Sequence, residues 1–211
     1  MAVLALVLFV AWILVVSLVP TISRARRCGA VVSRYRDPRG SAQWWARWIS
    51  TAGVLCGMAA PIAALAGLPP IGFVDHSLVA IGGLVTYAVG IGLTLVSQAA
   101  MGRSWRADVD PGARSELVTR GPFRVVRNPI LLGAELTAVG IALLVPNAFS
   151  LAMLAAFVTA HQIQVRVVEE PYLLRVHGAA YRRYAERTGR FVPGIGRLQP
   201  GNQEDGDQKP E

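Results

Sequence analysis

The chain has 211 residues, of which 53% are hydrophobic and only 16% are charged, and its mean hydropathy is +0.43. An average soluble domain has about a quarter charged residues, so the composition argues against a soluble globular protein. The formal net charge of +8 comes from basic residues in three blocks, 24–47, 103–127 and 166–209, with apolar stretches between them. This alternation is typical of the positive-inside rule in membrane proteins, and it argues against nucleic acid as a partner.

The apolar stretches predict membrane helices, because a helix needs about 20 apolar residues to cross a bilayer. Residues 2–20 predict a retained first helix rather than a cleaved signal peptide, since basic residues follow it and none precede it. Residues 49–68 predict a second helix, preceded by three tryptophans typical of the membrane interface, Trp44, Trp45 and Trp48. In this second helix the spacing of Gly53 and Gly57 is that of a close helix contact.

Residues 78–99 predict a third span, and residues 129–164 are too long for a fourth single helix. Pro146-Asn147 divides that region into a hairpin, whose short arms can tilt, stop short or line the protein interior. The sequence therefore predicts an all-α, polytopic membrane bundle of about five transmembrane helices, with a C-terminal helical hairpin and a cytoplasmic helical tail. The charge bias places the N-terminus outside and the C-terminus inside a membrane, and the Arg-rich composition indicates a bacterial cytoplasmic membrane.

Local signals refine this outline. Pro129 suits the first turn of a helix, with Asn128 as its N-cap, and Gly90-x-Gly92 indicates close helix packing. Cys28 is expected at the cytoplasmic interface and Cys56 within the second span, so the sequence predicts no disulfide. Cys28 is a weak candidate for acylation.

Two groups of polar residues in or beside the spans are candidates for function, because such residues are costly in lipid. Counting back from the hairpin turn places Glu135 level with His161. The pair either fixes the register of the hairpin or contacts substrate and transfers a proton. Arg166, Glu169 and Glu170 form the second group: their spacing puts Arg166 on one helical face with both carboxylates, and Pro171 indicates a bend there.

Three segments in the C-terminal half carry a resemblance to a family. They are VGIGLTLVSQAAMGRSW (89–105), LVTRGPFRVVRNPILLG (117–133) and RVVEEPYLLRVHGAAYRRYAERTGRFVP (166–193). In order and spacing they resemble the integral-membrane methyltransferases related to isoprenylcysteine carboxyl methyltransferase, to which phospholipid N-methyltransferases are similar. Two positions depart from the family's pattern: Asn128 stands where many relatives have His, and Leu131 stands where Tyr is usual.

The resemblance implies that S-adenosyl-L-methionine is the methyl donor. It indicates nine candidate cofactor-binding residues: Leu117, Val118, Thr119, Arg127, Asn128, Pro129, Leu131, Glu169 and Glu170. Carboxylates suit the cofactor's ammonium and ribose hydroxyls, Arg127 suits its carboxylate, and apolar side chains suit its adenine. Arg166 would orient a carboxylate acceptor, whereas Glu170 or Glu135 would take the proton of an amine or hydroxyl acceptor. Arg166 and Glu170 are thus the candidate catalytic residues, and Glu135 and His161 the candidate substrate-binding residues.

The expected organisation is N-terminal transmembrane helices in 1–84, a methyltransferase-like membrane core in 85–196, and a disordered tail in 197–211. The favoured function is methylation of a hydrophobic or lipid-like acceptor from the bilayer, at a carboxyl or hydroxyl oxygen, with membrane lipids as partners. Phospholipid-type N-methylation is an alternative. A non-catalytic membrane scaffold, favoured by the departures at Asn128 and Leu131, is another, and a small proton-coupled transporter is a third.

Overall fold

The computed structural model describes residues 1–18, 38–72, 76–101 and 117–199, and this described part is helical without a strand. Cys28 and the Gly102–Trp105 part of the family resemblance lie outside these ranges. The elements, in chain order, are α1 (Ala2–Trp12), the π-helix η1 (Ile13–Leu18), α3 (Ala42–Leu65), α4 (His76–Met101), the 3₁₀ helix η3 (Gly121–Arg124), α5 (Pro129–Leu144), α6 (Ala148–Ile163), the π-helix η4 (Gln164–Glu169), α7 (Glu170–His177) and α8 (Ala179–Arg187).

Three helices of the described part are long and apolar enough to cross a membrane: α3, α4 and the continuous helix Ala148–His177 that α6, η4 and α7 form together. Ala2–Val15 and Pro129–Leu144 are shorter apolar helices. Large side chains such as Leu55 (66% exposed) and Leu78 (70%) point away from the bundle, as lipid-facing residues do. The prediction of an all-α membrane bundle is confirmed: three helices are long enough to span, and the two shorter apolar helices lie where the other two of the five were predicted.

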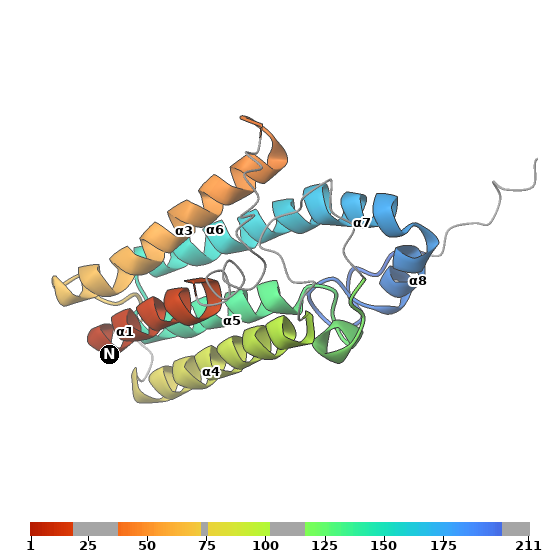
Figure 1. The fold of residues 1–211 in the computed structure, drawn as a ribbon. Coiled ribbons are helices and arrows are strands. Elements are labelled where there is room, and N and C mark those ends of the chain that lie inside the picture. Colours follow the sequence, from red (N-terminus) through yellow and green to blue (C-terminus); the bar gives the residue numbers. More distant parts are fainter. Residues whose placement is uncertain (19–37, 73–75, 102–116, 200–211) are drawn as a thin grey trace, which may run out of the picture.

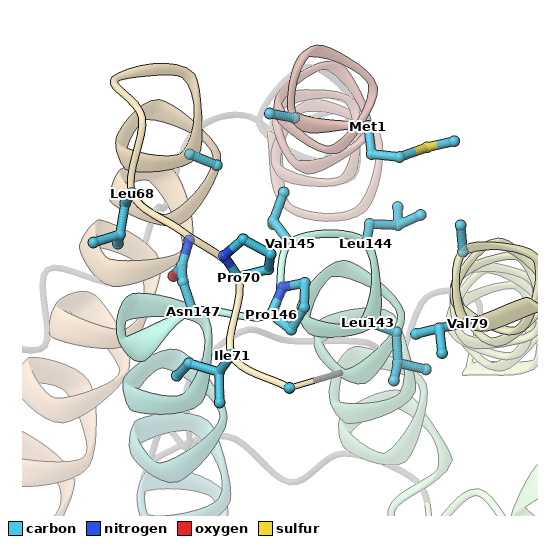
Figure 2. Close-up of a pocket in the computed structure, with 14 residues that line it drawn as sticks. Met1, Leu68, Pro70, Ile71, Val79, Leu143, Leu144, Val145, Pro146 and Asn147 are labelled. Atoms are coloured by element: carbon cyan, nitrogen blue, oxygen red, sulfur yellow. The ribbon is translucent and has the colours of Figure 1, made fainter. Parts of the chain in front are cut away.

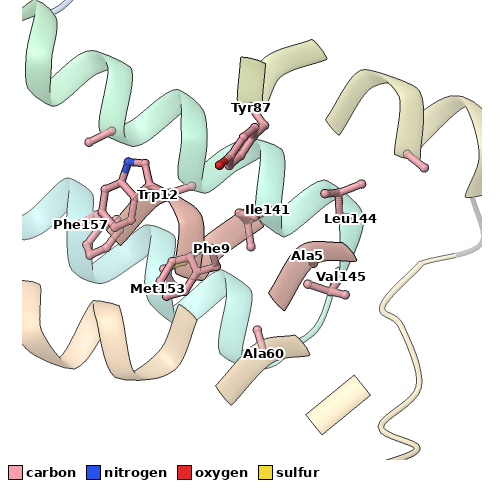
Figure 3. Packing of buried hydrophobic residues seen from close by; sticks show 13 residues of the cluster. Ala5, Phe9, Trp12, Ala60, Tyr87, Ile141, Leu144, Val145, Met153 and Phe157 are labelled. Atoms are coloured by element: carbon pink, nitrogen blue, oxygen red, sulfur yellow. The ribbon is translucent and has the colours of Figure 1, made fainter. Parts of the chain in front are cut away.

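The helices form two antiparallel pairs around a short central helix. α4 packs along α5 and α3 packs along α6, while α1 contacts α3 and α5 (Figure 1). Figure 3 shows the core, in which Phe9 and Trp12 of α1 meet Ile141 of α5 and Met153 of α6. The hydroxyl of Tyr87 donates to the Leu8 carbonyl at 2.9 Å, so a backbone acceptor in the core is also satisfied.

Glycines bring α4 and α5 into backbone contact. A Cβ atom added at Gly90 would lie 2.6 Å from the Gly133 carbonyl oxygen, and one added at Gly140 would lie 2.7 Å from the Gly83 carbonyl oxygen. Each contact is too short for any side chain. The predicted packing role of Gly90 is therefore confirmed, whereas that of Gly92 is wrong, because a Cβ there would meet nothing within 4 Å.

Helix α3 begins earlier than the hydropathy indicated. The Ser41 hydroxyl accepts the backbone N–H of Trp44 at 3.1 Å, which caps the helix at Ala42 and places the three tryptophans in its first turns rather than before it. The close contact predicted for Gly53 and Gly57 is confirmed. A Cβ at Gly53 would lie 2.7 Å from the Phe157 ring, and one at Gly57 would collide with Phe9 and Met153.

The predicted hairpin turn at Pro146-Asn147 is confirmed, and it joins α5 to α6. Asn147 caps α6 reciprocally with Ser150, and its side-chain amide donates to the Ala60 carbonyl of α3 at 2.8 Å. The backbone N–H of Ile71 donates to the Pro146 carbonyl at 2.6 Å. The two connections predicted to lie outside the membrane are therefore at one end of the bundle; which side of the membrane this end faces stays a prediction.

Replacing Asn147 by Ala is expected to lower the free energy of unfolding by about 2 kcal/mol, because the helix loses its cap and the Ala60 carbonyl loses a buried donor. Reversible unfolding in mixed detergent micelles measures the change. Ser41→Ala, which removes only a cap on a less buried helix end, should cost about 1 kcal/mol. Equal losses in the two variants would contradict the additional role of the Asn147 amide.

Candidate active site

Two pockets of comparable size lie at opposite ends of the described bundle. The first, about 420 Å³, lies at the end that holds the two connections, among Leu68, Ile71 and Leu144 (Figure 2). Its lining side chains are apolar except for Asn147, whose amide already bonds Ala60. None of the described side chains that line this pocket is an acid or a base.

The second pocket, about 310 Å³, lies between the first half of α3, the beginning of α5 and the end of α6 with η4. We call it the polar pocket. Its lining includes three residues predicted from the sequence, Leu131, His161 and Glu169, together with residues that were not predicted. The full lining is Gln43, Ala46, Arg47, Ser50, Thr51, Val54, Leu131, Ala160, His161, Gln164 and Glu169.

The predicted contact between Glu135 and His161 is confirmed. The imidazole Nδ1 lies 3.1 Å from Glu135 Oε1, and the side chains are 13% exposed for His161 and 22% for Glu135. The imidazole also stacks on the Phe157 ring, with centroids 5.9 Å apart. Two neighbours therefore hold the imidazole at the edge of the polar pocket.

The α3 side of the polar pocket was missed by the sequence analysis. Gln43 has a buried side-chain Nε2 that no described residue bonds, so this amide is a donor without an acceptor. On the opposite wall, Glu169 Oε1 accepts from Gln164 Nε2 at 3.1 Å. A signal existed: the polar residues Gln43, Arg47, Ser50 and Thr51 recur at helical spacing on one face of an apolar helix.

Glu170 does not share the polar pocket with Glu169. Its Oε1 accepts from Arg127 at 2.6 Å and from Arg190 at 2.7 Å, and its Oε2 accepts from Arg190 at 2.8 Å. Glu170 is 7% exposed and Arg127 is 6% exposed, so this cluster is buried. The hydrogen bonds that Arg190 donates to Glu170 raise the pKa of Arg190, which keeps that guanidinium charged.

Arg127 ties the C-terminal segment to the bundle. Besides Glu170, it donates to the carbonyl oxygens of Ala185 at 2.9 Å, Thr188 at 2.6 Å and Gly196 at 2.9 Å. These carbonyls come from the end of α8 and the segment after it. Arg127 therefore fixes three backbone carbonyls of the C-terminal segment beside the start of α5.

Asn128 and Pro129 occupy the N-cap and first position of α5, as predicted. The predicted side-chain cap is wrong, because the Asn128 side chain makes no bond to the helix. Its Nδ2 donates instead to the Arg190 carbonyl at 3.0 Å, which its backbone N–H also bonds at 3.1 Å. The Asn128 side chain thus holds the docked C-terminal segment rather than the helix.

The predicted grouping of Arg166 with the two carboxylates is wrong. Residues 164–169 form a π-helix, whose wider turn changes the face on which each side chain lies. Arg166 Nε donates to Gln162 Oε1 at 2.7 Å on the exposed surface, and Arg166 does not line the polar pocket. Pro171 was predicted to bend the helix. The departure from α-helical geometry lies just before it, in this π-helix, and α7 continues through the proline.

Two tyrosines of α8 complete the contact between the C-terminal segment and the bundle. The Tyr184 hydroxyl donates to the Phe123 carbonyl at 2.6 Å, and burial raises the pKa of Tyr184 to about 12. Burial, and secondly the charge of Glu170, raise the pKa of Tyr181. Both phenols therefore keep their protons at physiological pH, and Tyr184 keeps its hydrogen bond.

Leu117, Val118 and Thr119 lie in the extended segment before η3 and do not line the polar pocket. The structure thus divides the predicted site residues into two groups. Leu131, His161 and Glu169 surround the polar pocket, with Glu135 behind His161, whereas Arg127 and Glu170 belong to the buried ion cluster. The cofactor roles assigned to the predicted residues stay predictions.

Comparison with known proteins identifies the region that forms the α5, α6 and η4 side of the polar pocket. Residues 78–180 match the family described as phospholipid methyltransferase. The resemblance to membrane methyltransferases is thereby confirmed, and the match includes α4 to α7 with both Glu135 and Glu169. No curated protein matches the chain significantly.

Proposed function

Because residues 78–180 of this chain belong to the phospholipid methyltransferase family, we propose that the protein is an S-adenosylmethionine-dependent methyltransferase of the membrane that acts on a hydrophobic or lipid-like acceptor. One observation carries this proposal. The family-matching helices contribute His161 and Glu169 to a polar pocket in which the Gln43 amide has no partner among the described residues. A buried donor without an acceptor fits a site that a polar ligand completes.

The residues around the polar pocket fit S-adenosylmethionine by their chemistry. Glu169 would hold its ammonium, Arg47 its carboxylate, and the Gln43 amide a ribose or carboxylate oxygen. Leu131 and Val54 provide apolar cover for adenine, so Leu131 can serve the site without the hydroxyl that a tyrosine would bring. The bound cofactor would supply a methyl group on a positively charged sulfur.

Arg127 and Glu170 have a different part in this proposal from the one the resemblance implied. Their charged atoms bind each other and Arg190. They would therefore hold η4 and the C-terminal segment in place beside the polar pocket, rather than contact the cofactor. A fixed scaffold matters in methyl transfer, because the rate depends on alignment of the nucleophile with the methyl carbon.

The acceptor would come from the bilayer, since the polar pocket lies between helices with lipid-facing surfaces. Carboxyl or hydroxyl O-methylation and phospholipid N-methylation are both within this proposal, and the family's description favours a phospholipid. Arg166, the residue expected to orient a carboxylate, does not line the polar pocket. That position weakens the carboxylate alternative.

Glu169→Gln is expected to weaken binding of S-adenosylhomocysteine about 10-fold or more, because a charge-assisted hydrogen bond to the ligand's ammonium becomes a neutral one. Calorimetric titration of the protein in lipid nanodiscs measures the affinity. Glu186→Gln on α8, the same change outside the polar pocket, is the matched control and should bind as the wild type does.

Two results would contradict this proposal. Equal affinity of the Glu169→Gln and wild-type proteins would remove Glu169 from the cofactor site. Absence of binding by folded wild-type protein would favour a membrane scaffold without catalysis.

A further inference from the structure

We propose that His161 and Glu135 form a catalytic pair in which His161 takes a proton from the methyl acceptor and Glu135 positions the imidazole ring. The inference rests on the proposed function, because it assigns the proton-accepting group of the same polar pocket. Of the two residues, His161 lines the pocket and Glu135 does not. Glu135 therefore acts through His161 and is a positioning residue.

The orientation of the imidazole follows from its contacts. Nδ1 lies 3.1 Å from Glu135 Oε1, and a carboxylate accepts hydrogen bonds, so Nδ1 carries the ring proton. The lone pair is then on Nε2, which has no hydrogen-bond partner among the described residues. The stacked Phe157 ring, tilted by 22° from the imidazole plane, restricts rotation and keeps Nε2 in place.

Other groups that could take the proton are already engaged. Both carboxylate oxygens of Glu170 accept from Arg127 or Arg190. Glu169 bonds Gln164 and is assigned to the cofactor's ammonium. Of the polar groups around the polar pocket, the His161 imidazole is the base that remains.

A proton-accepting imidazole defines the class of acceptor. A carboxylate acceptor arrives without a proton and needs no base, whereas an amine or hydroxyl must lose one. The acceptor's lone pair forms the bond to the methyl carbon, the carbon–sulfur bond breaks and its electron pair returns to sulfur, and the acceptor's proton passes to Nε2. His161 then releases this proton to water. The pair thus favours an amine or hydroxyl acceptor on a lipid-like molecule.

The charged groups around His161 support a transient positive charge on its ring. Glu135 contacts it from α5, Glu169 approaches from η4, and Arg47 is the cation on the α3 wall. The Glu135 carboxylate, in contact with Nδ1, is the counter-charge for the imidazolium that forms during transfer. A general base must be unprotonated to act, so the pH–rate profile is the readout that separates this role from a structural one.

The first experiment compares the wild type with His161→Gln and Glu135→Gln in nanodiscs of an amine-headgroup phospholipid, with methyl-tritiated S-adenosylmethionine. His161→Gln should lower kcat by about 100-fold or more, the usual contribution of a general base, and the acid decline of the pH–rate profile should disappear. Glu135→Gln should cost about 10-fold, as loss of an orienting partner does. The affinity for S-adenosylhomocysteine should stay at the wild-type value in both variants.

His177→Gln, the same substitution outside the polar pocket, is the matched control and should keep the wild-type pH profile. A His161→Gln protein that binds S-adenosylhomocysteine and keeps both its rate and the acid decline would overturn the catalytic pair. Failure of the wild type to bind S-adenosylhomocysteine would instead contradict the proposed function, so the two failures are distinct.

A second experiment needs neither cofactor nor acceptor. Nitrogen-15 NMR of labelled histidines reports which ring nitrogen carries the proton, and the chain has only three histidines, so His161→Gln assigns the signal. The pair requires a His161 signal with the proton on Nδ1 at neutral pH. A proton on Nε2 would overturn the proposal whatever the activity of the protein.

Discussion

Glu170→Gln is expected to lower the free energy of unfolding by about 3 kcal/mol or more, because it leaves the buried guanidinium of Arg127 and the partly buried one of Arg190 without their counter-ion. Glu170 is the one carboxylate that Arg127 and Arg190 share, and both arginines also connect the C-terminal segment to the start of α5. We therefore expect α8 and residues 188–198 to detach before the membrane helices unfold. Hydrogen exchange of the protein in nanodiscs should show faster exchange in that segment, with the helices of the bundle protected.

Two further variants separate charge from geometry. Arg127→Lys keeps the positive charge but loses the planar fork that reaches three carbonyls and a carboxylate, so it should still destabilise the protein. Arg187→Gln, an exposed position at the end of α8, should change stability by less than about 0.5 kcal/mol. If the amides of α8 exchanged at the wild-type rate in the Glu170→Gln protein, the ion cluster around Glu170 would not be what holds the C-terminal segment in place.

Gly133→Ala is expected to destabilise the protein by about 2 to 3 kcal/mol, because a single methyl group must enter the backbone contact of α4 and α5. The added Cβ would lie 2.7 Å from the Gly90 carbonyl oxygen and 2.9 Å from the Thr94 backbone nitrogen. Backbone atoms cannot move aside as a flexible side chain can, so the helices must separate. Reversible unfolding in mixed micelles measures the loss.

Gly92→Ala is the matched control on α4, where a Cβ would meet nothing within 4 Å. There the change should be neutral or stabilising by up to about 1 kcal/mol, since Ala is the better helix former. The two substitutions are chemically identical and lie on neighbouring helices. Loss of stability of the same size at both positions would contradict the close contact between α4 and α5.

The sequence was sufficient for those parts of the fold that depend on local signals. Apolar length predicted α4 to within two residues at each end, and Pro146-Asn147 predicted the hairpin turn because proline and asparagine end and begin helices. Counting residues along both arms of the hairpin from that turn predicted the contact of Glu135 with His161. The start of α3 was missed, because hydropathy does not register amphipathic tryptophans that continue a helix beyond its apolar part.

The site was harder to predict because its residues meet through tertiary contacts. Spacing of three and four residues grouped Arg166 with Glu169 and Glu170, but that rule assumes an α-helix, and a π-helix separates them. Nothing local indicates that Arg127 and Arg190 share Glu170, since the partners are 43 and 20 residues apart. Gln43 was missed because the family motifs begin in α4, so none of them marks a residue of α3.

The most direct test of the account is transfer of tritium from methyl-labelled S-adenosylmethionine into lipid. The purified protein, in nanodiscs made from a total bacterial lipid extract, is incubated with the labelled cofactor, and the organic phase is counted over time. The expected result is that tritium accumulates in lipid at the same rate as S-adenosylhomocysteine forms. Glu169→Gln should strongly reduce both. A folded wild-type protein that leaves the lipid unlabelled and the cofactor intact would contradict the account.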